Sequence, residues 1–231
     1  MPIDISRVKA VCFDVDGTLS DTDDQFVQKL VRWISPVRYF VRGHDVHKIA
    51  RKLVMFTEGP GNWVYNLADR MGLDGKIVRM GDRLYEMGIG KSATPFQLIQ
   101  GVREMLENLK NHYPLSIISA RGEKSTYKFL SQFELLSYFN VVATSQTCEH
   151  TKPYPDPIEW AAARMEVPPA SCLMVGDTVV DILIGKKVGA QTVGVLCGFG
   201  ERNELEKAGA DLILENTADL MDYLIQDKST D

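Results

Sequence analysis

Short apolar runs alternate along this chain with segments of helical periodicity, and this alternation constrains the fold more than any other feature. Each run has the length of a strand and ends in small or polar residues. The runs are Val8–Val15, Leu115–Ser119, Asn140–Thr144, Ser171–Val175, Gln191–Leu196 and the weaker Asp211–Leu214. All but the last have the composition of strands buried on both faces, as in parallel sheets. The pattern predicts an α/β protein with a doubly wound parallel sheet and right-handed crossovers.

The segments between these runs have the spacing of amphipathic helices. In Phe96–Leu109, apolar residues recur every three or four positions, which predicts a helix with one buried face. Glu123–Leu136 and Pro157–Met165 are predicted to be helices as well.

One long stretch, from about Thr22 to Thr94, interrupts the alternation and contains no convincing buried strand. Its amphipathic patterns, such as Asp24–Ile34, Val46–Phe56 and Trp63–Met71, predict helices. We therefore expect two domains: a core formed by residues 1–21 and 95–231, and a helical domain, 22–94, inserted after the first strand. Hinges are expected near Asp21 and Gly88–Pro95.

Composition excludes several classes of partner. The 231 residues carry a net charge of −5, which gives no reason to expect nucleic-acid binding. No apolar run approaches the length of a membrane span or signal peptide. The four cysteines are far apart and form no Cys-x-x-Cys pair, which fits a reducing compartment. We expect a cytoplasmic protein whose oligomeric state the sequence does not indicate.

Polar residues follow the predicted strands at their carboxyl ends. Asp14 and Asp16 end the first strand, Ser119 ends the second, and Asp177 follows the run Ser171–Val175. Ligands of open parallel sheets bind beyond this edge, so these groups are expected to converge. Lys152, in the loop after Asn140–Thr144, is expected at the same edge.

Three of the expected neighbours, Asp14, Asp177 and Asp181, are carboxylates that cannot all stay ionised together without a cation. Their hard oxygen atoms, with no nearby cysteine or histidine, favour Mg²⁺ over zinc. With magnesium bound, an aspartate can attack a phosphate ester and form an acyl phosphate.

The remaining groups suit the same reaction. Lys152 supplies positive charge to a phosphoryl group, and the Ser119 hydroxyl and backbone N–H groups of the Asp16–Gly17 turn supply donors. Asp16 can protonate the leaving oxygen and later deprotonate the attacking water. Gly17 is suited to a position where backbone approaches a phosphate closely.

Four ordered motifs carry a resemblance to a known family. They are Asp14-Val15-Asp16-Gly17-Thr18-Leu19, Ser119, Lys152-Pro153-x-Pro155-x-Pro157 and Gly176-Asp177-x-x-x-Asp181. This set resembles the haloacid dehalogenase-like hydrolase superfamily, and the helical insert and the C-terminal region resemble its phosphoglycolate phosphatase-like branch. The resemblance covers essentially the whole chain outside the insert.

The resemblance implies a Rossmann-like core and a phosphatase in which Asp14 is the nucleophile and Asp16 the general acid and base. It implies Mg²⁺ held by the side chains of Asp14 and Asp177 and the backbone carbonyl of Asp16, with Asp181 supporting the metal or the lysine. The expected phosphate-binding residues are Ser119, Lys152, Gly17, Thr18 and Ala120.

Some features leave alternatives open. Arg121 stands where the branch more often has a lysine, and it could contact phosphate or simply begin the next helix. Asp181 could also stabilise the start of a helix near Thr178. In the insert, a solvated helix face is the favoured interpretation of His44 and His47. The same holds for a basic group that could otherwise attract anionic substrates: Arg38, Arg42, Lys48, Arg51 and Lys52.

The favoured function is hydrolysis of a small phosphate monoester. A sugar phosphomutase or a pyrophosphatase of the same superfamily would keep every motif. A dehalogenase fits less well because it would lack the second aspartate, Asp16. Phosphonate cleavage would need a Schiff-base lysine in the insert, and nothing singles one out among Lys48, Lys52, Lys76 and Lys91. A non-catalytic regulatory protein is the alternative from another class, although intact motifs argue against it.

Overall fold

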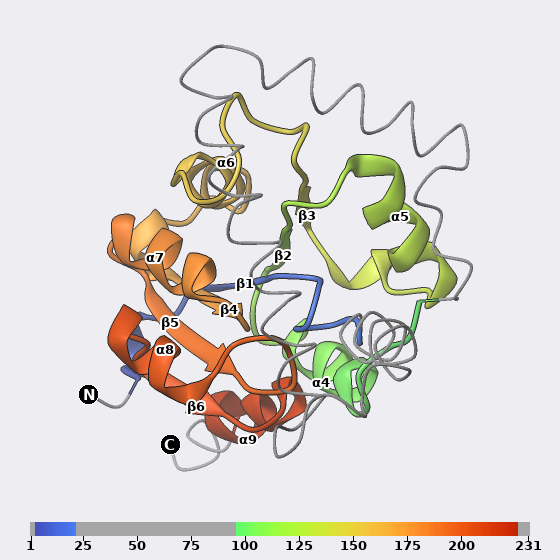
Figure 1. The fold of residues 1–231 in the computed structure, drawn as a ribbon. Coiled ribbons are helices and arrows are strands. Elements are labelled where there is room, and N and C mark those ends of the chain that lie inside the picture. Colours follow the sequence, from blue (N-terminus) through green and yellow to red (C-terminus); the bar gives the residue numbers. More distant parts are fainter. Residues whose placement is uncertain (1–2, 22–95, 226–231) are drawn as a thin grey trace, which may run out of the picture. The chain divides into compact units, whose positions relative to one another are not determined.

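The computed structural model describes residues 3–21 and 96–225, which belong to one compact unit formed by Met1–Asp21 and Phe96–Asp231 (Figure 1). Thr22–Pro95 forms a second unit. The helices predicted for 22–94, His44, His47 and the basic group all lie outside the described residues. The two predicted domains, with the helical character of the insert, therefore stay a prediction.

Six parallel strands form a single sheet in the order β3-β2-β1-β4-β5-β6. Their bounds are β1 Ala10–Phe13, β2 Leu115–Ile118, β3 Val141–Ala143, β4 Cys172–Gly176, β5 Gln191–Val195 and β6 Leu212–Leu214. The first strand of the chain lies inside the sheet, and the order reverses between β1 and β4. The predicted doubly wound parallel sheet is confirmed.

Side chains of β1 alternate between two apolar cores, as the two-residue period of a strand requires. Val11 and Phe13 enter one cluster, whereas Ala10 and Cys12 enter the other. All four residues are fully buried. A strand covered on both faces reads as a continuous apolar run, which is how β1 was recognised in the sequence.

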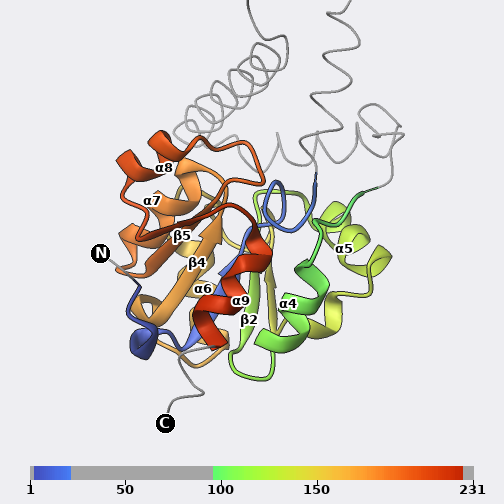
Figure 2. The same cartoon turned by 90° about the horizontal axis from the view of Figure 1, so that it is seen from below.

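Helices cover both faces of the sheet (Figures 1 and 2). Residues of α4, α5 and α9 pack into the cluster that contains Phe13, and residues of α6 and α7 pack into the cluster that contains Cys12. Short α8 packs against α7. The helices are α4 Val102–Leu109, α5 Glu123–Gln132, α6 Asp156–Arg164, α7 Val179–Lys187, α8 Arg202–Ala208 and α9 Leu220–Ile225.

The prediction of a helix over Phe96–Leu109 was wrong about its start: in the structure, α4 begins only at Val102. Gly101 precedes it in the left-handed region at φ 81°, so the helix cannot extend back through this residue. The preceding segment instead bonds to the chain beyond β1. The Asp21 N–H donates to Gln97 O at 2.9 Å, and the Ile99 N–H donates to Leu19 O at 3.0 Å.

The other predicted helices differ less from the structure. α5 ends at Gln132, before the predicted Leu136, and a separate 3₁₀ turn follows at Leu136–Tyr138. Further 3₁₀ turns lie at Ile5–Arg7, Pro169–Ser171 and Thr217–Asp219. Across 3–21 and 96–225, no helix combines the length and apolar character needed to cross a membrane.

Candidate active site

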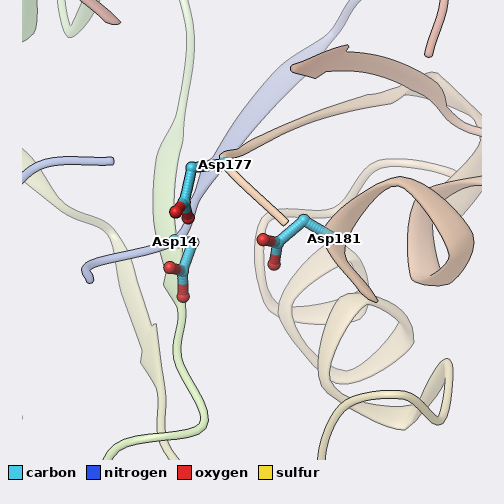
Figure 3. A group of neighbouring side chains, drawn as sticks. All are labelled: Asp14, Asp177 and Asp181. Carbon is cyan, nitrogen blue, oxygen red and sulfur yellow. The ribbon is translucent and has the colours of Figure 1, made fainter. Parts of the chain in front are cut away.

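Three carboxylates meet at the carboxyl edge of the sheet, beside the point where the strand order reverses. Asp14 directly follows β1, Asp177 directly follows β4, and Asp181 lies in the first turn of α7. One oxygen of each lies within 4.8 Å of the others, and all three residues are buried. In Figure 3, the carboxyl group of Asp181 points toward Asp14 and Asp177. The convergence that the sequence predicts for them is therefore present.

Lys152 joins two of these carboxylates. Its Nζ lies 2.5 Å from Asp14 Oδ1 and 2.7 Å from Asp181 Oδ1. The lysine side chain is only 5% exposed, so both ion pairs are shielded from water. Burial opposes the charge on Lys152, but the two carboxylates outweigh burial and raise its pKa. The loop before α6 therefore places a permanent positive charge next to Asp14.

Asp181 has a second task at the start of α7. Its Oδ2 accepts the Thr178 backbone N–H at 3.1 Å and the Thr178 hydroxyl at 2.6 Å, as part of a capping box. The helix start expected near Thr178 is confirmed. Because Oδ1 bonds to Lys152 and Oδ2 to Thr178, Asp181 supports the lysine and the helix together.

Asp177 is completely buried and held by the chain around it. Its Oδ2 accepts the Phe199 N–H at 2.8 Å, and its Oδ1 lies 3.4 Å from the Thr18 hydroxyl. The loop after β5 passes so close that a Cβ on Gly198 would lie 2.2 Å from Asp177 Oδ2. On Gly200, a Cβ would lie 1.9 Å from the Asp177 carbonyl oxygen. Only glycines allow this loop to enclose Asp177.

Gly17 lies against Asp177, and its expected place beside a phosphate stays a prediction. Its φ is 71°, and a Cβ there would lie 2.3 Å from Asp177 Oδ2, so the close approach is to a carboxylate of the protein. Its N–H donates to Ser20 O at 2.9 Å, so one of the backbone donors expected for phosphate in the Asp16–Gly17 turn has a partner within the turn. The Thr18 side chain is likewise directed to Asp177 and is fully buried.

Ser119 lies just beyond β2, the neighbour of β1, and is 3% exposed. Its backbone N–H donates to Ala143 O at 2.9 Å, which fixes the residue to β3. The Ser119 hydroxyl oxygen accepts the backbone N–H of Arg121 at 3.1 Å. Ala120 between them is exposed.

Asp16 pairs with Arg121, a contact that the sequence analysis missed. Arg121 Nε donates to Asp16 Oδ2 at 2.9 Å, and Arg121 Nη2 donates to Asp16 Oδ1. Arg121 is not part of the following helix, which begins at Glu123. A signal was available: each residue lies three positions beyond its strand, and β1 and β2 are adjacent and parallel.

The donors of this site fit a divalent cation. Burial raises the pKa of Asp14 to about 7 against the effect of Lys152, and the Asp181 and Asp16 carboxylates add to the rise. A cation bound to these oxygens would reverse that effect. Asp14 and Asp177 offer hard carboxylate oxygens of the kind that Mg²⁺ prefers. Asp181 belongs to the same group of carboxylates that could hold a metal ion, and its oxygens also bond to Lys152 and Thr178.

Together, the fold and the site define a doubly wound α/β protein with a buried aspartate–lysine centre at the switch point of its sheet. The chain matches the family model described as haloacid dehalogenase-like hydrolase over residues 11–195, which is more than half of its length. It therefore belongs to this family, as its motifs indicated.

Relatives carry two different activities in their names. The chain is 27% identical to pyrophosphatase PpaX of Anoxybacillus flavithermus, covering 94% of this chain and 97% of that protein. It is 25% identical to phosphoglycolate phosphatase of Nitrosococcus oceani, covering 96% and 99%. A crystal structure of a hydrolase from Pseudomonas syringae superposes with a TM-score of 0.64 at 26% identity, covering 94% and 98%.

Proposed function

We propose that this chain is a phosphatase that hydrolyses a small phosphorylated substrate through a covalent phosphate on Asp14. One observation carries the proposal. The Asp14 carboxylate is buried at the end of β1, 2.5 Å from the ammonium of Lys152 and within reach of a second carboxylate, Asp177. A buried carboxylate between a fixed cation and a suitable metal ligand is equipped to attack phosphorus.

The reaction has two steps. An Asp14 carboxylate oxygen bonds to phosphorus while the bond from phosphorus to the leaving oxygen breaks, and Asp16 gives that oxygen a proton. A water molecule then attacks phosphorus and gives its proton to Asp16. The bond between phosphorus and Asp14 breaks, which releases inorganic phosphate and restores both aspartates.

Lys152 keeps Asp14 in place and faces the negative charge of the phosphoryl group. Asp14 and Asp177 would hold Mg²⁺, together with the backbone carbonyl of Asp16. When bound, the metal would neutralise phosphate charge and let a carboxylate approach phosphorus. Ser119, Gly17, Thr18 and Ala120 remain candidates for the phosphate pocket, but Gly17 N–H and the Thr18 hydroxyl already have partners in the protein.

Pyrophosphate is the second candidate substrate, favoured by the relatives named pyrophosphatase. Both substrates present a terminal phosphoryl group to Asp14, and they differ only in the leaving group: an alkoxide from a monoester or a phosphate from pyrophosphate. The first measurement should therefore compare phosphoglycolate with pyrophosphate by kcat/KM.

The cellular location is also proposed. The four cysteines, Cys12, Cys148, Cys172 and Cys197, are free thiols in the structure. Unpaired cysteines, two of them in the apolar core, fit a reducing cytoplasm. Small phosphorylated metabolites are the partners we propose there.

The deciding experiment measures phosphate release from a panel of monoesters and pyrophosphate in Mg²⁺, with Asp14→Asn as the blank. We expect the substitution to abolish turnover, at least about 10³-fold, because the amide cannot replace the nucleophile. Borohydride reduction of acid-quenched wild-type enzyme should convert a phosphorylated Asp14 to homoserine, detected by peptide mass spectrometry. Full turnover in Asp14→Asn, or no release from any compound by the wild type, would remove the proposal.

A further inference from the structure

The backbone of Arg121 is fixed between two strand ends. Its N–H donates to Ser119 Oγ at 3.1 Å, and its carbonyl accepts the Ser145 N–H at 3.1 Å. Ser119 follows β2, and Ser145 lies just beyond β3. The starting point of the arginine side chain is therefore set by the sheet itself.

The guanidinium of Arg121 is fixed as well. It faces both oxygens of Asp16 through Nε and Nη2, which is the fork geometry that specifies the plane of a carboxylate. The guanidinium carbon lies 4.9 Å from the centre of the Phe96 ring. The Arg121 side chain is 13% exposed, whereas that of Asp16 is 36% exposed. Of this pair, Arg121 is thus the more buried residue, and it holds the more accessible Asp16.

A direct contact between Arg121 and substrate fits these observations less well. Its third nitrogen, Nη1, is buried and has no hydrogen-bond partner within the described part of the chain. An atom without access to solvent cannot meet a ligand unless the side chain moves, and the other two nitrogens are engaged by Asp16. A carboxylate oxygen has two lone pairs, so an Asp16 oxygen that accepts a hydrogen bond from Arg121 can still exchange a proton with a substrate.

We propose that Arg121 is a positioning residue that acts through Asp16. It holds the Asp16 carboxylate in the orientation for proton transfer at the leaving oxygen. The proposal rests on the proposed function, because it assumes that Asp16 serves as the acid. A misplacement of about 1 Å can cost a catalytic group roughly 10²-fold in rate, so the effect should be large for a substrate whose leaving group needs a proton.

Leaving-group dependence tests this role. Arg121→Met should lower kcat for an alkyl phosphate by about 10- to 100-fold and for p-nitrophenyl phosphate by less than about threefold, with little change in KM. Arg121→Lys should recover little, because a lysine offers a point charge in place of a fork. The control is Arg164→Met, which removes an arginine stacked 3.6 Å from the Trp160 ring centre. Equal losses on both substrates with a raised KM would overturn the proposal in favour of a phosphate contact.

A double-mutant cycle tests the positioning role of Arg121 separately from the proposed acid role of Asp16. Adding Arg121→Met to Asp16→Asn should cause no further loss, whereas additive losses would show that Arg121 acts independently. If Asp16→Asn lowers kcat equally for both substrates, Asp16 is not the acid. Only crystal structures can then test whether Arg121 positions Asp16. Crystal structures should then show one Asp16 conformer in the wild type and several in Arg121→Met. A single unchanged conformer would refute the proposal. If Arg121→Met does not fold, Arg121→Lys carries every one of these comparisons.

Discussion

At the residue scale, burial and the neighbouring charges together set the pKa of Asp14. Removing a carboxylate from water disfavours its charged form, and Lys152 only partly offsets this for Asp14. In the metal-free protein the pKa of Asp14, the expected nucleophile, is therefore about 7. When the pH equals this pKa, half the molecules carry a protonated Asp14. This predicts that metal binding and proton release at Asp14 are linked.

Stability of the metal-free protein should report the same shift. Between about pH 4 and pH 7 the folded state keeps a proton on Asp14 that the unfolded chain has released, so stability falls as pH rises through this window. Relative to Asp14→Asn, the wild type should lose on the order of a few kcal/mol between pH 4.5 and 8 in EDTA. Thermal unfolding of both proteins at several pH values measures this difference, and saturating Mg²⁺ should reduce it. Parallel stability curves in EDTA would contradict the shift.

Individual residues also show where sequence reasoning stops. Asp14, Asp177 and Lys152 were identified because each follows a strand or lies in a loop after one, so topology brings them together. Asp181 joins them from the first turn of α7, four residues beyond Asp177. The pair of Asp16 and Arg121 was missed, because 105 positions separate its members and no local pattern links them. The offset of three residues beyond adjacent strands is a signal only once the strand order is known.

At the element scale, the loop after β5 is the part of the site with the least visible sequence signal. It contributes a backbone N–H, from Phe199, and two close glycine contacts, none of which depends on a reactive side chain. Motif reasoning looks for carboxylates, lysines and hydroxyls, and therefore passes over such a loop. The late start of α4 has a related cause: the apolar spacing of 96–101 suits a helix, but the left-handed Gly101 and the bonds of this segment to Leu19 and Asp21 prevent one.

Gly198→Ala should weaken metal binding, because its methyl group would displace the Asp177 carboxylate. We expect roughly a tenfold loss of Mg²⁺ affinity, the size of effect seen when a group supporting a metal ligand is disturbed. Titration calorimetry on the purified protein measures it directly.

Gly189→Ala is the matched control for this substitution. Gly189 has a φ of 74°, and its added Cβ would meet only Ala170, at 3.6 Å. It should cost about 1 kcal/mol of stability through backbone strain and leave Mg²⁺ affinity unchanged. Equal Mg²⁺ affinity in Gly198→Ala and the wild type would show that the loop does not support Asp177.

At the scale of the whole molecule, the chain leaves the described unit after Asp21 and returns at Phe96, and these two points are joined. Ser20 and Leu98 form an antiparallel bridge, and the Asp21 N–H bonds to Gln97 O at 2.9 Å. Because these two points are adjacent, a short linker could connect them in place of residues 22–95 at a small entropic cost of loop closure.

Replacing residues 22–95 by a short Gly/Ser linker should therefore leave a core that folds cooperatively and still binds Mg²⁺ through Asp14 and Asp177. Near-ultraviolet circular dichroism during thermal unfolding measures the first property, and calorimetry measures the second, with the same shortened protein carrying Asp14→Asn as its control. A gradual, non-cooperative melt would mean that the two units depend on each other for folding.

The capping box of α7 has a consequence for how newly made molecules behave. Asp181 closes the helix and holds Lys152 through the two oxygens of one carboxylate, so the helix start and the lysine position form a single event. A chain whose α7 has not yet formed lacks the support that keeps the ammonium beside Asp14. Incompletely folded molecules would then not hydrolyse phosphate esters. During refolding, the time at which turnover begins would therefore report when α7 has formed.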